Sequence, residues 1–238
     1  CSLVGSEMCI RDSIVAVCIF QFLLGNPSNF MNNDPNNHPL NMLGTIYKGG
    51  VIVPVIQTLL LTVLALSIER YFALRSAFGK GSLAKFVANI KEALAAGDLK
   101  KAQEICDKQR GSVANVVTAT LRKYEEMEKN TALPKEQKLL AIQKELEEAT
   151  ALEMPMMQQN LPIIATITTL GTLMGLLGTV IGMIRSFAAL SAGGGADSMA
   201  LSQGISEALI NTAFGILTGA LAVISYNYYT NKIDKLTY

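Results

Sequence analysis

The stretch GISEALINTAFGILTG, residues 204–219, carries one acidic residue, Glu207, among apolar and small side chains. A carboxylate inside a membrane-spanning helix costs about 2 to 4 kcal/mol, so an acid at such a position usually has a function, often in moving protons or ions. Glu207 is therefore the first candidate for chemistry. This interpretation requires that the segment around it spans a membrane.

The composition favours a protein with several membrane spans. Half of the 238 residues are hydrophobic, 16% are charged, and the formal net charge is +1. Residues 70–160 hold 15 of the 20 basic residues and 12 of the 19 acidic residues. A charged domain flanked by apolar segments is typical of a polytopic membrane protein.

Three apolar segments predict transmembrane helices, because about 20 apolar residues are needed to cross a bilayer. They are residues 51–69, 161–190 and 200–226. Lys and Arg are concentrated in residues 70–160, and they recur in the tail, residues 227–238, so the positive-inside rule predicts that both regions are cytoplasmic. We expect an all-α polytopic membrane protein with three transmembrane helices, or four in the intact chain, and long helices extending into a cytoplasmic helical domain.

The remaining segments are expected outside the cytoplasm or at the N-terminus. Residues 25–50 are rich in Asn and Pro and predict an extracytoplasmic loop, and residues 191–199 predict a short periplasmic turn. Residues 1–13 are interpreted as a doubtful or non-native start. Residues 14–24 are apolar but too few for a full span, so a partial N-terminal span and a signal-peptide core both stay open.

Small and hydroxylated residues recur at steps of three and four in the last two apolar segments, which places them on one helix face. Close helix packing in lipid is the interpretation we prefer for the glycines. They are Gly171, Gly175, Gly178, Gly182, Gly215 and Gly219. The polar members could instead face a pore, although Ser and Thr hydroxyls also bond to their own helix. These pore-facing candidates are Thr168, Thr172, Ser186, Asn211 and Thr218.

Glu207 has two interpretations. It could face a pathway for protons, or it could lie near the outer end of its helix, hydrated or paired with Arg185. A proton relay usually needs several ionisable groups in series, and the last two apolar segments supply only Glu207 at depth. If protons cross here, another subunit is expected to bring the second carboxyl group.

Other chemistries find little support in the sequence. It contains no phosphate-binding GxxxxGK[ST] loop, no GxSxG elbow and no HExxH motif. Four cysteines without a CxxC pair and a single histidine predict no metal site and no cofactor. Basic and acidic residues interleave in the charged region, so we expect neither nucleic-acid binding nor enzymatic activity.

Two sequence blocks carry a family resemblance. LGTLMGLLGTVIGMIRSF, residues 170–187, precedes GISEALINTAFGILTGALAVISYNYY, residues 204–229. This pair resembles the ExbB/TolQ/MotA proton-channel family, in particular its ExbB-like branch, and the likeness covers about residues 45–235. The resemblance implies a subunit of the bacterial inner membrane that assembles as a homo-oligomer, in this branch a pentamer, within the lipid bilayer.

The resemblance also implies partners and site residues. The ring would surround an ExbD-like or TolR-like single-span protein and drive a TonB-like or TolA-like protein with the proton-motive force. The family's pathway residues correspond to Thr179, Thr212 and Glu207. On a helical wheel Thr212 lies about 140° from Glu207, so either the helix faces two neighbours or one assignment is wrong.

Alternative functions use the same residues. A TolQ-like motor for envelope maintenance or a flagellar-type stator would share the proton chemistry with other partners. A non-conducting scaffold would use the glycine faces for packing alone and show no dependence on protons.

Overall fold

The computed structural model describes residues 3–35, 37–192 and 198–237, and in these ranges the chain is helical, without a β-strand. Three of the described helices are long and apolar enough to cross a membrane: α3 (Ile52–Ala77), α8 (Leu161–Ala192) and α9 (Ser198–Thr237). The predicted fold class, an all-α polytopic membrane protein, is confirmed.

The chain divides into two compact units, each described separately below. The first, the span unit, consists of Cys1–Ile68 and Asn160–Tyr228, and the second, the charged unit, consists of Glu69–Gln159 and Tyr229–Tyr238. The division follows the charge pattern of the sequence, because the charged residues that need water are gathered in the second unit.

The described part of the span unit contains several helical segments before α3. Helix α1 (Leu3–Cys18) continues as one wider turn of π-helix, η1 (Ile19–Leu24). Two 3-10 turns follow, η2 (Pro27–Asn29) and η3 (Met31–Asn33), before helix α2 (Met42–Lys48). The side chain of Asn41 caps α2 by accepting a hydrogen bond from the Gly44 N–H at 3.0 Å.

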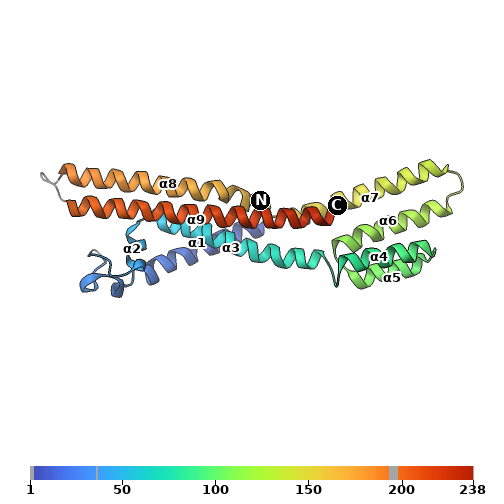
Figure 1. The fold of residues 1–238 in the computed structure, drawn as a ribbon, viewed down its shortest axis with the longest axis horizontal. Helices are drawn as coiled ribbons and strands as arrows, with labels where there is room; N and C mark the ends of the chain where they lie inside the picture. Colours follow the sequence, from blue (N-terminus) through green and yellow to red (C-terminus); the bar gives the residue numbers. More distant parts are fainter. Residues whose placement is uncertain (1–2, 36, 193–197, 238) are drawn as a thin grey trace. The chain divides into compact units, whose positions relative to one another are not determined.

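Helices α8 and α9 lie side by side as a long antiparallel hairpin (Figure 1). Most of the predicted turn, residues 191–199, lies outside the described residues. Helix α9 continues past the predicted end of the span at residue 226, and its last turns bury Tyr229 and Ile233 in the charged unit.

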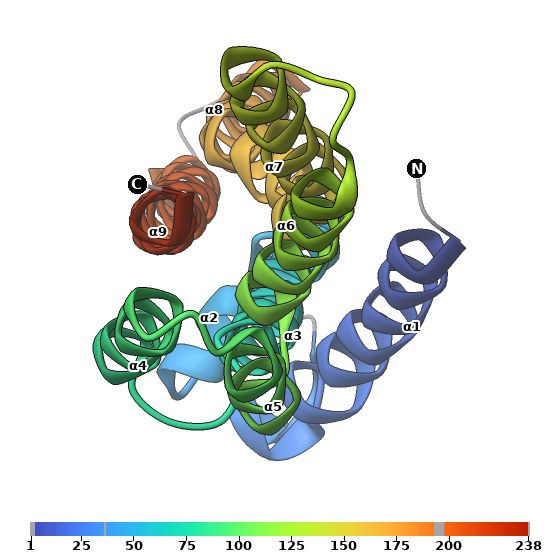
Figure 2. The same cartoon turned by 90° about the vertical axis from the view of Figure 1, so that its right-hand side faces the viewer.

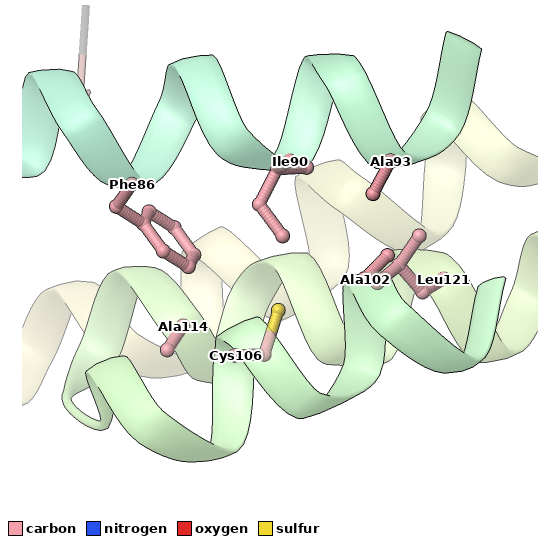
Figure 3. Close-up of a cluster of buried hydrophobic side chains, with 7 residues drawn as sticks. All are labelled: Phe86, Ile90, Ala93, Ala102, Cys106, Ala114 and Leu121. Atoms are coloured by element: carbon pink, nitrogen blue, oxygen red, sulfur yellow. The ribbon is translucent and has the colours of Figure 1, made fainter. Parts of the chain in front are cut away.

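The charged unit contains four further helices: α4 (Leu83–Ala95), α5 (Leu99–Gln109), α6 (Ser112–Lys129) and α7 (Lys135–Gln158). Helices α6 and α7 lie side by side (Figure 2). The apolar faces of α4, α5 and α6 meet in a cluster shown in Figure 3, whose members are Phe86, Ile90, Ala93, Ala102, Cys106, Ala114 and Leu121. This is the expected arrangement for amphipathic helices in water.

The buried cation of the charged unit is Arg70, which is 2% exposed. It pairs with Glu69 and donates hydrogen bonds to the carbonyl oxygens of Met156 at 3.2 Å and Met157 at 3.4 Å. Those carbonyls belong to the last turn of α7, where backbone acceptors lack helical partners. Arg70 therefore supplies hydrogen-bond donors to the free carbonyls at the end of α7 and holds that end against α3.

Candidate functional site

The interface between α8 and α9 is built from glycines. A Cβ atom on Gly175 would lie 3.0 Å from the Gly215 Cα and 3.0 Å from the Asn211 carbonyl oxygen. Along this line of close contact between α8 and α9, called the seam below, a Cβ atom on Gly171 would lie 3.2 Å from the backbone nitrogen of Gly219. The predicted packing glycines thus lie where the two backbones approach each other, and only small residues permit this approach.

The hydroxylated residues of the seam mostly bond to their own helices. Thr168 donates to the Ala165 carbonyl at 2.6 Å, Ser186 to Gly182 at 2.9 Å, and Thr218 to Phe214 at 2.8 Å. Thr172 donates to Thr168 at 3.4 Å. Within this chain, the structure places these four pore-facing candidates in the seam, with their donors satisfied locally.

Thr179 and Thr212 are different, because their hydroxyls meet across the two helices. The Thr179 Oγ1 lies 3.0 Å from the Thr212 Oγ1, and either can be the donor. The Gly175 carbonyl oxygen lies 3.3 Å from the first and 3.2 Å from the second. Two hydroxyl protons therefore share several acceptors, and the hydroxyls can exchange the roles of donor and acceptor.

Asn211 connects α9 to the end of α2. Its side chain is 3% exposed, and its Nδ2 donates a hydrogen bond to the Gly49 carbonyl at 3.0 Å. Gly49 follows the last residue of α2, where backbone carbonyls lack partners within the helix, so this bond gives its carbonyl a hydrogen-bond donor. Within the described residues the Asn211 Oδ1 has no hydrogen-bond partner, although it is buried.

Glu207 borders a cavity of about 270 Å³ in the span unit. The cavity is also lined by residues of α8, by Asn211 of α9 and by the segment before α3. These residues are Gly49, Val51, Ile52, Gly178, Ile181, Gly182, Arg185 and Asn211. The Glu207 carboxylate accepts a hydrogen bond from Gln203 Nε2 at 3.3 Å. The part of the chain that the structure describes contains no ion pair between Glu207 and Arg185, but the charges of Lys48 and Arg185 act on this carboxylate.

Helix α9 faces two neighbours at this site. Thr212 lies against α8, whereas Glu207 borders a cavity that α8 shares with Gly49, Val51 and Ile52. An angle of about 140° on the wheel is what two residues that face different neighbours of one helix would have. Glu207 and Thr212 are five residues apart, which is about 7.5 Å along a helix axis.

Sequence reasoning missed two residues of the site, Gln203 and Gly49. Gln203 precedes Glu207 by one helical turn, a spacing at which side chains meet, so the sequence held a signal for it. Gly49 lies far away in the chain and contributes only its backbone carbonyl. No local pattern could have pointed to it.

The described residues contain no group of three or more His, Cys, Asp and Glu side chains that could hold a metal ion. The carboxyl group and the two hydroxyls can each accept and donate hydrogen bonds, and the cavity beside the carboxyl group has room for water, so together they are groups that a proton pathway can use.

Known proteins show similar sequences. The MotA/TolQ/ExbB proton channel family matches residues 109–238, more than half of the chain. The putative biopolymer transport protein ExbB-like 1 of Synechocystis is 33% identical over 193 residues, which is 78% of this chain and 69% of that protein. The ExbB homolog of Methanothermobacter thermautotrophicus is 26% identical over 82% of this chain and 66% of its own length.

A TolQ protein is also among the relatives. The Tol-Pal system protein TolQ of Pseudomonas aeruginosa is 27% identical over 124 residues, 52% of this chain and 54% of that protein. The chain thus spans about half to two thirds of the length of several relatives that it matches. The extent of the family match and the ExbB-like identity together show that the chain belongs to the MotA/TolQ/ExbB proton channel family.

Proposed function

We propose that this chain is an ExbB-like subunit of the bacterial inner membrane that couples the proton-motive force to TonB-type energised transport at the outer membrane. The single observation that carries the proposal is the contact of 3.0 Å between the Thr179 and Thr212 hydroxyls in an otherwise glycine-packed hairpin. The Thr179 hydroxyl also lies 2.8 Å from the Leu176 carbonyl of its own helix. It differs from the other seam hydroxyls because a hydroxyl of the opposite helix lies within hydrogen-bond distance.

In this proposal Glu207 sets the charge of the pathway and the two threonines polarise or hydrate it. The cavity of about 270 Å³ beside Glu207 has room for water and offers polar partners, including the buried Asn211 Oδ1. The threonine pair follows about 7.5 Å further along α9. Water and side chains together would then form a continuous polar path.

The chain does not complete this path by itself. Glu207 is the one acidic residue between residues 198 and 233. A second carboxyl group is therefore assigned to an ExbD-like or TolR-like single-span partner. We also assign to the intact complex a ring of several copies, in this branch a pentamer, and a TonB-like or TolA-like protein that receives the work. The charged unit and the end of α9 lie on the cytoplasmic side in this scheme.

The test replaces Glu207 by Gln in cells that depend on this complex for energised uptake. The matched control is Asp234→Asn, because it removes an exposed carboxylate from the same helix. We expect Glu207→Gln to abolish most uptake while the complex still assembles, and the control to keep both. Unchanged uptake and assembly in Glu207→Gln would remove the pathway role and leave a non-conducting scaffold.

A second candidate is a TolQ-like motor for envelope maintenance, which the resemblance to TolQ of Pseudomonas aeruginosa supports. The proton chemistry would be the same, and only the partners would differ. Co-purification separates the two. An ExbD-like and a TonB-like protein bound to this chain indicate the first function, and a TolR-like and a TolA-like protein indicate the second. A flagellar-type stator would instead bring a partner with a peptidoglycan-binding domain.

A further inference from the structure

The charged unit contains a cavity of about 950 Å³ that the proton pathway does not use. Four basic side chains line it: Arg75, Lys80, Arg110 and Lys232. No carboxylate is among its lining side chains, and no ion pair of the described residues includes Arg75, Lys80 or Arg110. Gathering like charges around one cavity is unfavourable unless an anion enters it.

Two loops hold the basic side chains of this cavity in place. The Lys80 N–H donates a hydrogen bond to the Gln109 carbonyl at 2.6 Å, and the Gln109 Nε2 donates to the Phe78 carbonyl at 2.9 Å. Gly79 has a φ of +75°, and a Cβ atom there would collide with the Arg110 carbonyl. Lys80 and Arg110, which are 30 residues apart, are thereby fixed on one rim.

Aromatic side chains supply a second surface of the cavity. The Lys232 Nζ lies 5.7 Å from the ring centroid of Tyr71 and 5.6 Å from that of Phe78. These cation–π contacts orient Lys232 at the cavity wall. The rings also offer apolar area beside the positive charges. A ligand with an anionic group and an apolar part matches this combination.

The place of the cavity along α3 agrees with such a ligand. The uncharged run of α3 ends at Ile68, and Arg75 follows seven residues later on the same helix. That separation is about 10 Å of helix, and the headgroup layer on each side of the hydrocarbon core is about 5 to 8 Å deep, so Arg75 follows just beyond this layer and its long side chain can reach back to it. Aromatic and basic residues are typical of this layer.

We propose that this cavity binds a phosphate group, either the phosphodiester of an anionic lipid headgroup or a small soluble phosphate ester. Arg75 and Arg110 can donate paired N–H groups to phosphate oxygens, and Lys80 and Lys232 add point charges. Bound lipid would tie the ends of α3 and α9 to the membrane surface. The site is independent of Glu207 and of the threonine pair.

The experiment uses the purified full chain in detergent and native mass spectrometry. Phosphatidylglycerol, phosphatidylcholine and, separately, glycerol phosphate are titrated into the wild type and two variants. The pocket variant is Lys80→Gln with Arg110→Gln, and the matched control is Lys85→Gln with Arg122→Gln, which removes the same charges from exposed positions outside the cavity.

We expect the pocket variant to weaken phosphatidylglycerol binding at least about tenfold relative to the control, since each basic residue near an anionic lipid contributes severalfold. Loss of glycerol phosphate binding in the pocket variant, with phosphatidylglycerol unaffected, would support the site and identify a soluble ligand. Equal losses in both variants, no loss in either, or equal binding of phosphatidylcholine would overturn the proposal.

Discussion

Helix contacts in the α8–α9 hairpin are made by glycines, whereas those among α4, α5 and α6 are made by larger residues such as Phe86, Ile90 and Leu121. Water drives the burial of large apolar side chains in the charged unit. In lipid that driving force between helices is absent, and close backbone packing takes its place. The comparison shows why one chain needs two different sequence patterns to pack helices.

Polar groups also differ between the two regions. In the charged unit the exposed ion pairs Lys123–Glu126, Lys129–Glu125 and Lys144–Glu148 lie on single helices and contribute little to stability. In the hairpin the polar side chains bond to backbone carbonyls, and the Thr179–Thr212 pair crosses from one helix to the other. The hydroxyl pair therefore joins two helices, whereas each of these surface ion pairs lies within one helix.

The largest expected effect is in the core of the charged unit. Phe86→Ala should lower the free energy of unfolding of this unit by about 3 to 5 kcal/mol, because a buried ring is removed and a cavity remains. Hydrogen exchange of the α4–α6 segments in urea measures this change. Leu94→Ala, at a position 41% exposed on the same helix, is the control. Equal losses in the two variants would contradict a core built on Phe86.

A smaller effect is expected in the hairpin. Gly175→Ala should cost about 1 to 3 kcal/mol, because the added Cβ meets the backbone of Gly215 and Asn211, which cannot move without shifting α9. This loss of stability can be measured as a lower melting temperature of the solubilised protein. Ala213→Val adds bulk on the exposed face of α9 and should change little. If Ala213→Val were the more damaging change, the glycine seam would not control the packing.

The smallest effect concerns Cys106 in the core of the charged unit. Burial raises the pKa of this thiol. The unfolded thiol ionises first, so the contribution to stability is full below the ordinary pKa of about 8.5 and is lost as pH rises towards the raised pKa. We expect the free energy of unfolding to fall less between pH 8 and pH 10 in Cys106→Ala than in the wild type, because the variant has no thiol whose pKa differs between the folded and unfolded states. If the free energy of unfolding depended on pH in the same way in Cys106→Ala and in the wild type, this contribution of the buried thiol would be ruled out.

Much of the fold follows from local patterns in the sequence. The uncharged run before Ile68 and the small-residue steps in α8 and α9 predict spans, and the apolar face of α4 predicts a core helix. The extension of α9 to Thr237 was not anticipated, because its last turns mix apolar Ile233 with charged residues. Their helical state depends on burial in the charged unit.

The candidate site was only partly predictable. The family resemblance pointed to Thr179 and Thr212, whereas the helical wheel placed Thr212 about 140° away from Glu207. The wheel describes one helix and one partner, and it cannot show that α9 faces both α8 and the region from Gly49 to Ile52. The bond from Asn211 to the Gly49 carbonyl joins residues 162 positions apart, beyond any local pattern.

The central claim is that the crossed hydroxyl pair serves proton movement and not packing alone. The direct measurement is proton flux into liposomes that contain the complex of this chain with its single-span partner. Thr179→Val with Thr212→Val keeps the shape of both side chains and removes both hydroxyls. Thr166→Val is the control, because its exposed hydroxyl bonds only to the Pro162 carbonyl of its own helix, at 2.8 Å.

We predict that the double variant assembles normally and loses flux at least about tenfold, equivalent to about 1.4 kcal/mol on the barrier, while Thr166→Val conducts like the wild type. Wild-type flux in a fully assembled Thr179→Val, Thr212→Val complex would contradict the account.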